Sequence, residues 1–156
     1  MTTKTRLSLA LATGLLLLAG CAKDTETVPS APSKLTLLAD GGPWAITAYT
    51  RTTGSNAAVD RRPAIACERD DRFVFGRNGV LTGTEGPLVC RSGDTPTTVT
   101  STQPWSFNSA QTQLTIGNAS TGIPYEVVLL DANGLKLRWS RTSGGQTVVD
   151  YLEYRN

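Results

Sequence analysis

The stretch FVFGRNGVLT, residues 73–82, decides the fold class of this chain. Phe73 and Phe75 alternate with side chains of the other face, as in a β-strand, where successive side chains point to opposite sides. Asn78-Gly79 then separates this run from the next apolar run. Asn-Gly is the strongest short-range signal for a β-hairpin, because both residues tolerate a positive φ. The stretch therefore predicts two antiparallel strands joined by a tight turn.

Short segments of the same kind follow one another along the chain, with turn residues between them and almost no helical periodicity. Residues 34–156, about 120 in all, are enough for one domain. About eight sequential strands with mostly short connections favour an all-β, antiparallel, up-and-down barrel, because closure removes exposed strand edges. A two-sheet sandwich is the alternative. The further strands are predicted near Trp44–Tyr49, Thr97–Phe107, Leu114–Ile116, Tyr125–Leu130, Leu135–Trp139 and Thr147–Tyr154.

The alternation within these strands also predicts which side chains share a face of the sheet. In the first strand it places Tyr49 on the face opposite Trp44, and a long polar loop is expected over residues 51–66. Pro104 suggests that its strand lies at an edge, carries a bulge or is split in two. In the last strand one face carries Val148, Asp150, Leu152 and Tyr154.

The first twenty residues have the order of an export signal. Lys4 and Arg6 precede an apolar run, Leu7–Leu18, and Ala19-Gly20 stands directly before Cys21. The apolar run has about a dozen residues, whereas a helix needs about 20 to cross a bilayer. We therefore expect a signal peptide over residues 1–20, followed by a flexible tether, 21–33, that is polar and carries two prolines.

The segment Leu18-Ala19-Gly20-Cys21 resembles the lipobox of bacterial lipoproteins. This resemblance implies that Cys21 carries fatty acyl chains such as palmitate and becomes the mature amino terminus. More than one acyl chain is what stable membrane anchoring requires. Ala22, where retained lipoproteins have aspartate, implies transfer to the outer membrane in a Gram-negative cell envelope, facing either the periplasm or the surface.

The other two cysteines, Cys67 and Cys90, are about 20 residues apart. In an oxidising compartment a disulfide is the natural assignment, and closing such a loop contributes about 3 kcal/mol to stability. A metal pair or a reactive thiol is the alternative, but the chain offers neither histidine nor CxxC spacing to support it.

Composition limits the function classes. Without the two cations of residues 1–20, 13 Lys and Arg balance 13 Asp and Glu, and no basic stripe with interleaved aromatics suggests nucleic acid. The chain has no histidine, which removes the commonest general base and metal ligand. We expect a monomer that is not an enzyme and has no cofactor, no metal and no catalytic residues. A carboxylate-dependent enzyme is the least favoured alternative.

Two features resemble the lipocalin-like domain of small bacterial envelope lipoproteins. Gly42-Pro43-Trp44 is similar to the Gly-x-Trp element that opens lipocalin barrels. The second feature is an ordered series that consists of Cys67-Glu68-Arg69-Asp70-Asp71-Arg72-Phe73-Val74-Phe75, Gly79, Glu85-Gly86, Cys90, Trp105-Ser106-Phe107, Leu114-Thr115-Ile116 and Tyr125. The resemblance covers residues 42–138 and implies a lipocalin-like barrel, with Trp44 as the plug of its closed end and Arg138 or Arg155 stacked on it. It implies no single ligand.

Two groups of side chains are candidates for binding. Trp105, Phe107 and Tyr125 are ligand-binding candidates, although the aromatic residues of so small a domain could equally fill its core. The carboxylates of Glu68, Asp70 and Asp71 could bind calcium, but they lack the spacing of a dedicated loop, and a solvated strand entrance is the simpler interpretation.

Two functional hypotheses follow. In the first, the barrel is a lipid-anchored envelope protein that binds a small apolar or amphipathic molecule. Its partners are then the membrane and that ligand. In the second, it is an inhibitor that blocks a lysozyme or a protease through an exposed loop, such as residues 60–62 or 143–145.

Overall fold

The computed structural model describes residues 30–156, of which Ala31–Asn156 form one compact unit. The predicted signal peptide, Cys21 and most of the predicted tether lie outside the described residues. In the described part, no helix has both the length and the apolar character needed to span a membrane.

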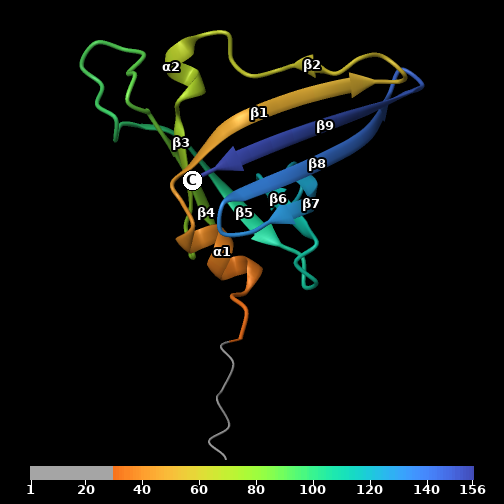
Figure 1. Cartoon of the computed structure of the whole chain (residues 1–156), viewed down its shortest axis with the longest axis horizontal. Helices are drawn as coiled ribbons and strands as arrows, with labels where there is room; N and C mark the ends of the chain where they lie inside the picture. Colours follow the sequence, from red (N-terminus) through yellow and green to blue (C-terminus); the bar gives the residue numbers. More distant parts are fainter. Residues whose placement is uncertain (1–29) are drawn as a thin grey trace, which may run out of the picture. The chain divides into compact units, whose positions relative to one another are not determined.

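One antiparallel sheet makes up the domain, and it closes on itself (Figure 1). Eight strands follow one another around a barrel in sequence order, and pairing of the first with the last closes it, which confirms the predicted fold class. The barrel strands are β1 (Trp44–Thr53), β3 (Arg72–Phe75), β4 (Val80–Thr84), β5 (Val99–Phe107), β6 (Gln113–Ile116), β7 (Ile123–Leu130), β8 (Gly134–Ser143) and β9 (Gln146–Arg155). A ninth strand, β2 (Val59–Asp60), pairs with the far part of β1.

The predicted hairpin forms between β3 and β4. Gly79 has a φ of 78°, which glycine adopts without strain, and the amide of Gly76 donates to the carbonyl of Val80 at 2.8 Å. β5 meets two neighbours in turn. Up to Pro104 its residues pair with β4, and from Trp105 onward they pair with β6, so Pro104 lies where the pairing changes sides.

The predicted common face of Trp44, Ile46 and Ala48 in β1 is wrong beyond Ile46. The register with β9 shifts between Ile46 and Ala48, and such a bulge moves every later side chain to the other face. Tyr49 therefore packs against the core, and Arg51 also points inward. The expected loop over residues 51–66 is also shorter than predicted, because β1 continues to Thr53 and β2 follows.

Two helices were not predicted: α1 (Lys34–Asp40) and the single-turn α2 (Ala66–Arg69). Ser33 caps α1, since its hydroxyl accepts a hydrogen bond from the amide of Thr36. Figure 1 shows α1 at the end of the barrel where β1 begins and β9 ends. The indole Nε1 of the fully buried Trp44 donates to the carbonyl of Leu38 at 2.9 Å. Trp44 thus closes this end under α1.

Neither arginine expected to stack on Trp44 does so in the described structure. Arg138 instead forms an ion pair with Glu126 on the outer face of the barrel, at 2.8 Å. The cations that do lie over aromatic rings are Arg141, on Trp139, and Lys136, on Tyr151.

Aromatic side chains fill the barrel near α1. Phe75 makes edge-to-face contacts with Trp105 and Tyr154, whose ring centroids lie 5.5 and 6.2 Å away. Such contacts add stability beyond the area that they bury. The buried core consists of Leu38, Trp44, Phe75, Leu81, Trp105, Leu114, Tyr125, Leu135, Leu137, Leu152 and Tyr154.

Candidate functional site

Two of the three predicted ligand-binding residues, Trp105 and Phe107, lie together in a surface groove of about 330 Å³. The groove runs between the end of β5 and the first turn of α1, which contributes Leu35. We call it the β5–α1 groove. Its lining residues are Leu35, Arg77, Gly79, Trp105, Ser106, Phe107, Asn108, Ser109 and Gln111.

The floor of the β5–α1 groove is aromatic and rigid. The rings of Trp105 and Phe107 meet edge to face, with centroids 5.7 Å apart. The indole of Trp105 also donates to the carbonyl of Gly76 at 3.2 Å, which holds the ring in one orientation. Trp105 is almost fully buried and belongs to the core, whereas Phe107 is half-buried and offers part of its ring to the groove.

The rim of the groove is polar. The turn between β5 and β6 is held by Asn108, whose side-chain oxygen accepts hydrogen bonds from the amides of Thr112 and Gln113. Gln111 in this turn has a φ of 52°, the left-handed value that residues other than glycine seldom adopt. The ammonium group of Lys34, the first residue of α1, donates to the Gln111 carbonyl at 2.9 Å. The turn and the helix are therefore fixed to each other across the groove.

Tyr125, the third predicted residue, does not line this groove. It is buried in the core, with its ring centroid 6.4 Å from that of Trp139, and burial raises the pKa of its hydroxyl to about 12. The structure thus brings Trp105 and Phe107 together in the groove but not Tyr125, and only Phe107 offers substantial ring surface to a ligand.

An ionic cluster that the sequence analysis missed lies inside the barrel, toward the end opposite α1. The carboxylate of Asp150, 1% exposed, accepts hydrogen bonds from Nε of Arg51 at 2.6 Å and from Nη1 of Arg141 at 2.6 Å. Burial acts to raise the pKa of Asp150, but the hydrogen bonds from Arg51 and Arg141 together with their charges outweigh it and lower the pKa. The sequence feature that could have revealed this cluster is the position of Asp150, which shares one face of the last strand with the apolar residues Val148 and Leu152.

Beside the disulfide lies a polar pocket of about 450 Å³, which includes Glu68, Asp71 and Glu85. The predicted bond between Cys67 and Cys90 is confirmed, with the Cα atoms 5.3 Å apart. Glu85 is buried, and its carboxylate accepts a hydrogen bond from the amide of Cys90 at 3.0 Å. The pocket therefore lies directly against the disulfide-linked loops.

The carboxylates of Asp70 and Asp71 differ in their surroundings. Oδ2 of Asp70 accepts a hydrogen bond from the amide of Leu88 at 2.7 Å, so this residue holds a loop. No hydrogen bond is formed by either carboxylate oxygen of Asp71 in the described structure, and Oδ1 of Asp71, like Oδ1 of Asp70, is buried without a partner. Burial, followed by the charge of Glu85, raises the pKa of Asp71 to about 6. Among residues 30–156, no three carboxylate or cysteine side chains are grouped so that they could hold a metal ion.

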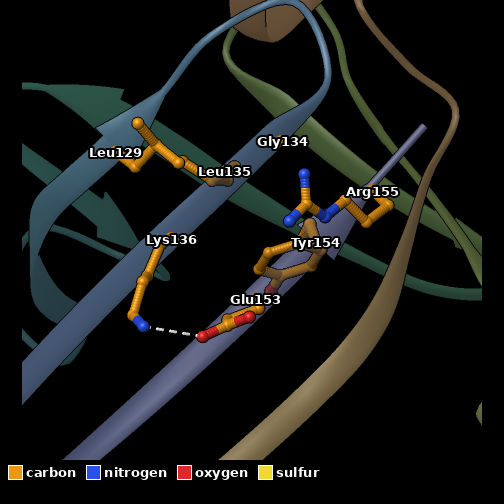
Figure 2. A pocket seen from close by; sticks show the side chains of 7 residues that line it. All are labelled: Leu129, Gly134, Leu135, Lys136, Glu153, Tyr154 and Arg155. Carbon is orange, nitrogen blue, oxygen red and sulfur yellow. Dashed lines mark ion pairs between the residues drawn. The ribbon is translucent and has the colours of Figure 1, made fainter.

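A smaller recess of about 190 Å³ lies between β8 and β9 near α1 (Figure 2). Lys136, Glu153 and Arg155 are the charged residues that line it, and the first two form an ion pair at 2.7 Å. Because these groups are paired with each other across two neighbouring strands, we interpret the recess as part of the sheet surface.

Comparison of the chain with known protein families, curated proteins and solved structures finds no match. The fold assignment therefore rests on the sheet topology, and the choice of site rests on its geometry.

Proposed function

We propose that this protein is a non-enzymatic, lipid-anchored lipoprotein of the cell envelope with a lipocalin-like barrel that binds a small amphipathic ligand in the β5–α1 groove. The observation that carries the ligand-binding part is the pairing of an aromatic floor with a polar rim in a groove of about 330 Å³. Small-molecule sites are typically concave and mostly apolar, with a few polar groups that orient the ligand.

The filled core favours this groove over the barrel interior. Near α1 the interior is occupied by Trp44, Phe75 and Tyr154, and farther along it carries the Arg51–Asp150–Arg141 cluster. A wholly apolar ligand there would remove the water that reaches the partly exposed Arg51 and Arg141, which costs free energy. In the groove, the exposed part of Phe107 can contact an apolar group while Arg77 and Asn108 contact polar ones.

The proposed anchor also bears on the ligand. The chain between Cys21 and Lys34 can span at most about 45 Å, because an extended residue covers about 3.5 Å. Since Lys34 begins the helix that forms one wall of the groove, a lipid on Cys21 would hold the groove within this distance of a membrane surface. Amphipathic molecules collect at such surfaces.

Lipidation is tested by growing expressing cells with a radiolabelled palmitate and comparing the natural chain with Cys21→Ser. We expect label on the natural protein alone and loss of detergent-phase partitioning in the variant. Equal partitioning of the two proteins would contradict the anchor.

Ligand binding is tested with the chain from Ala22 onward, titrated with the neutral fluorescent probe N-phenylnaphthylamine. Phe107→Ser should weaken binding about fivefold, because it removes part of the apolar floor. Val128→Ser is the matched control, since Val128 is 47% exposed on β7 and does not line the groove. Equal affinity of the Phe107→Ser variant and the natural protein, or no binding at all, would refute the assignment of the groove.

Inhibition of a lysozyme or a protease is the second candidate function, and one observation favours it. Ile65, Leu88 and Val89 are 56%, 56% and 40% exposed, and each lies within two residues of a disulfide cysteine. Exposed apolar side chains on a cross-linked loop suit a protein partner. Inhibition of lysozyme by the natural protein, lost in Leu88→Asp, would favour this function over ligand binding in the groove.

A further inference from the structure

A second recess, of about 220 Å³, lies at the opposite end of the barrel from the β5–α1 groove, where β2 pairs with β1. Two of its residues are arginines and none is acidic, and the one carboxylate that binds Arg51, Asp150, is shared with Arg141, so positive charge is in excess around the recess. Its lining residues are Arg51, Thr53, Asn56, Ala57, Val59 and Arg61.

The strand pairing places the two arginines on the same face of the sheet. Arg51 stands directly opposite Val59, and residues in register across two strands point to the same side. Arg61 is two residues beyond Val59, and its amide donates to the carbonyl of Tyr49 at 2.6 Å, which extends the pairing. Arg61 therefore follows Val59 onto the face that carries Arg51.

The charge of Arg51 is only partly balanced by Asp150, and within the described structure one of its nitrogen atoms is free to donate hydrogen bonds. Its Nε and Nη2 bind Asp150, but the same carboxylate also binds Arg141, so one negative charge is shared by two guanidinium groups. Within residues 30–156, no group accepts a hydrogen bond from Nη1 of Arg51, and no carboxylate forms an ion pair with Arg61. The Arg51 side chain is 27% exposed, so water and solutes reach it.

The other wall of the recess is apolar. Val59 is 57% exposed, and Ala57 lines the recess with it. A cavity of about 150 Å³ holds a benzene molecule, so the volume of this recess suits a single ring that carries a charged group. Arg61 can bind a carboxylate with two parallel hydrogen bonds, and Nη1 of Arg51 can add a further one.

We propose that Arg51 and Arg61 form a binding site for a small amphipathic carboxylate, whose apolar part packs on Val59 and Ala57. Asp150 and Arg141 act as positioning residues that hold the Arg51 guanidinium against the recess. This site shares no residue with the β5–α1 groove and does not depend on the function proposed for that groove.

The experiment uses benzoate as the probe, with the ¹⁵N-labelled chain from Ala22 onward observed by NMR. Benzoate should shift the amide signals of Thr53, Ala57 and Val59, whereas the neutral isostere benzamide should not. Arg61→Gln should weaken benzoate binding at least fivefold. Because Arg61 is exposed, this variant keeps the barrel folded. Arg91→Gln, an exposed arginine outside the recess, is the matched control and should bind as the natural protein does.

Inorganic phosphate separates this proposal from a simple anion site, since it carries charge but no apolar part and should bind more weakly than benzoate. Three outcomes would overturn the proposal: shifts confined to Ser106 and Asn108 in the other groove, equal shifts with benzamide, or equal affinity in Arg61→Gln. The N-phenylnaphthylamine assay depends on Phe107, so failure of one proposal leaves the other standing.

Discussion

Replacement of Asp71 by asparagine should stabilise the protein at neutral pH. Oδ1 of Asp71 is buried without a partner, next to Glu85 in the disulfide pocket. Its pKa is about 6 in the folded protein, compared with 3.8 for an unperturbed aspartate. The folded state therefore binds this proton more tightly than the unfolded state does. Ionised Asp71 costs stability above pH 6, and this cost disappears as the pH falls below about 4.

A shift of about two pKa units corresponds to roughly 3 kcal/mol, at about 1.4 kcal/mol for each unit. Asp71 is only partly buried and water reaches the pocket, so we expect about half of this value. Asp71→Asn removes the charge with little change of shape. The free energy of unfolding should rise by about 1.5 kcal/mol at pH 7 and remain unchanged at pH 4.

Urea unfolding followed by tryptophan fluorescence, at pH 4, 5, 6 and 7 and at low salt, measures this difference. Asp94→Asn is the matched control, because it makes the same chemical change in the same pocket, and we expect less than about 0.5 kcal/mol from it. A variant no more stable than the natural protein at pH 7 would refute the electrostatic explanation. So would an equal gain at pH 4 and pH 7.

Three further variants test the packing, the buried ion pairs and the disulfide. Asp150→Asn should lower the free energy of unfolding by about 3 kcal/mol, because it leaves Arg51 and Arg141 without their shared carboxylate. Thermal unfolding measures this loss. Asp131→Asn, in the turn between β7 and β8, is the control and should cost less. Gly86→Ala should cost at least about 2 kcal/mol, since the new Cβ would overlap the backbone carbonyl of Asp70, and an unchanged urea midpoint would contradict this close approach. The double variant Cys67→Ser/Cys90→Ser should lose about 3 kcal/mol, and reductant should bring the natural protein to the same urea midpoint; if reductant changes nothing, the disulfide does not stabilise the fold.

The barrel was predictable because its signals are local. The hairpin at Asn78-Gly79 and the common face of alternate residues in β9 follow from the spacing of neighbouring residues, and both agree with the structure. The bulge in β1 carries no such signal. It arises where β1 meets β9, since Ile46 stands opposite Tyr154 and Ala48 opposite Glu153, about 100 residues away in the chain.

The same bulge explains why the ionic cluster was missed. The alternation of the last strand places Asp150 inside, but its partners come from two other strands, and the bulge alone turns Arg51 inward. The aromatic floor of the β5–α1 groove was predicted, but its helical wall was not. Trp105 and Phe107 were named, but the opposite wall belongs to α1, a helix of seven residues. Two turns are too few for hydrophobic periodicity to reveal.

Closure of the barrel by β1 and β9 constrains the order in which the chain can fold. The seam pairs Ala45 with Arg155, so one edge of β1 has no partner until β9 has been synthesised and has left the ribosome. Contacts between residues so distant in sequence slow folding, and an unpaired edge invites aggregation in the meantime. A chain truncated before β9 would expose two edges, those of β1 and β8, and such fragments should be removed by proteolysis instead of persisting as partial barrels.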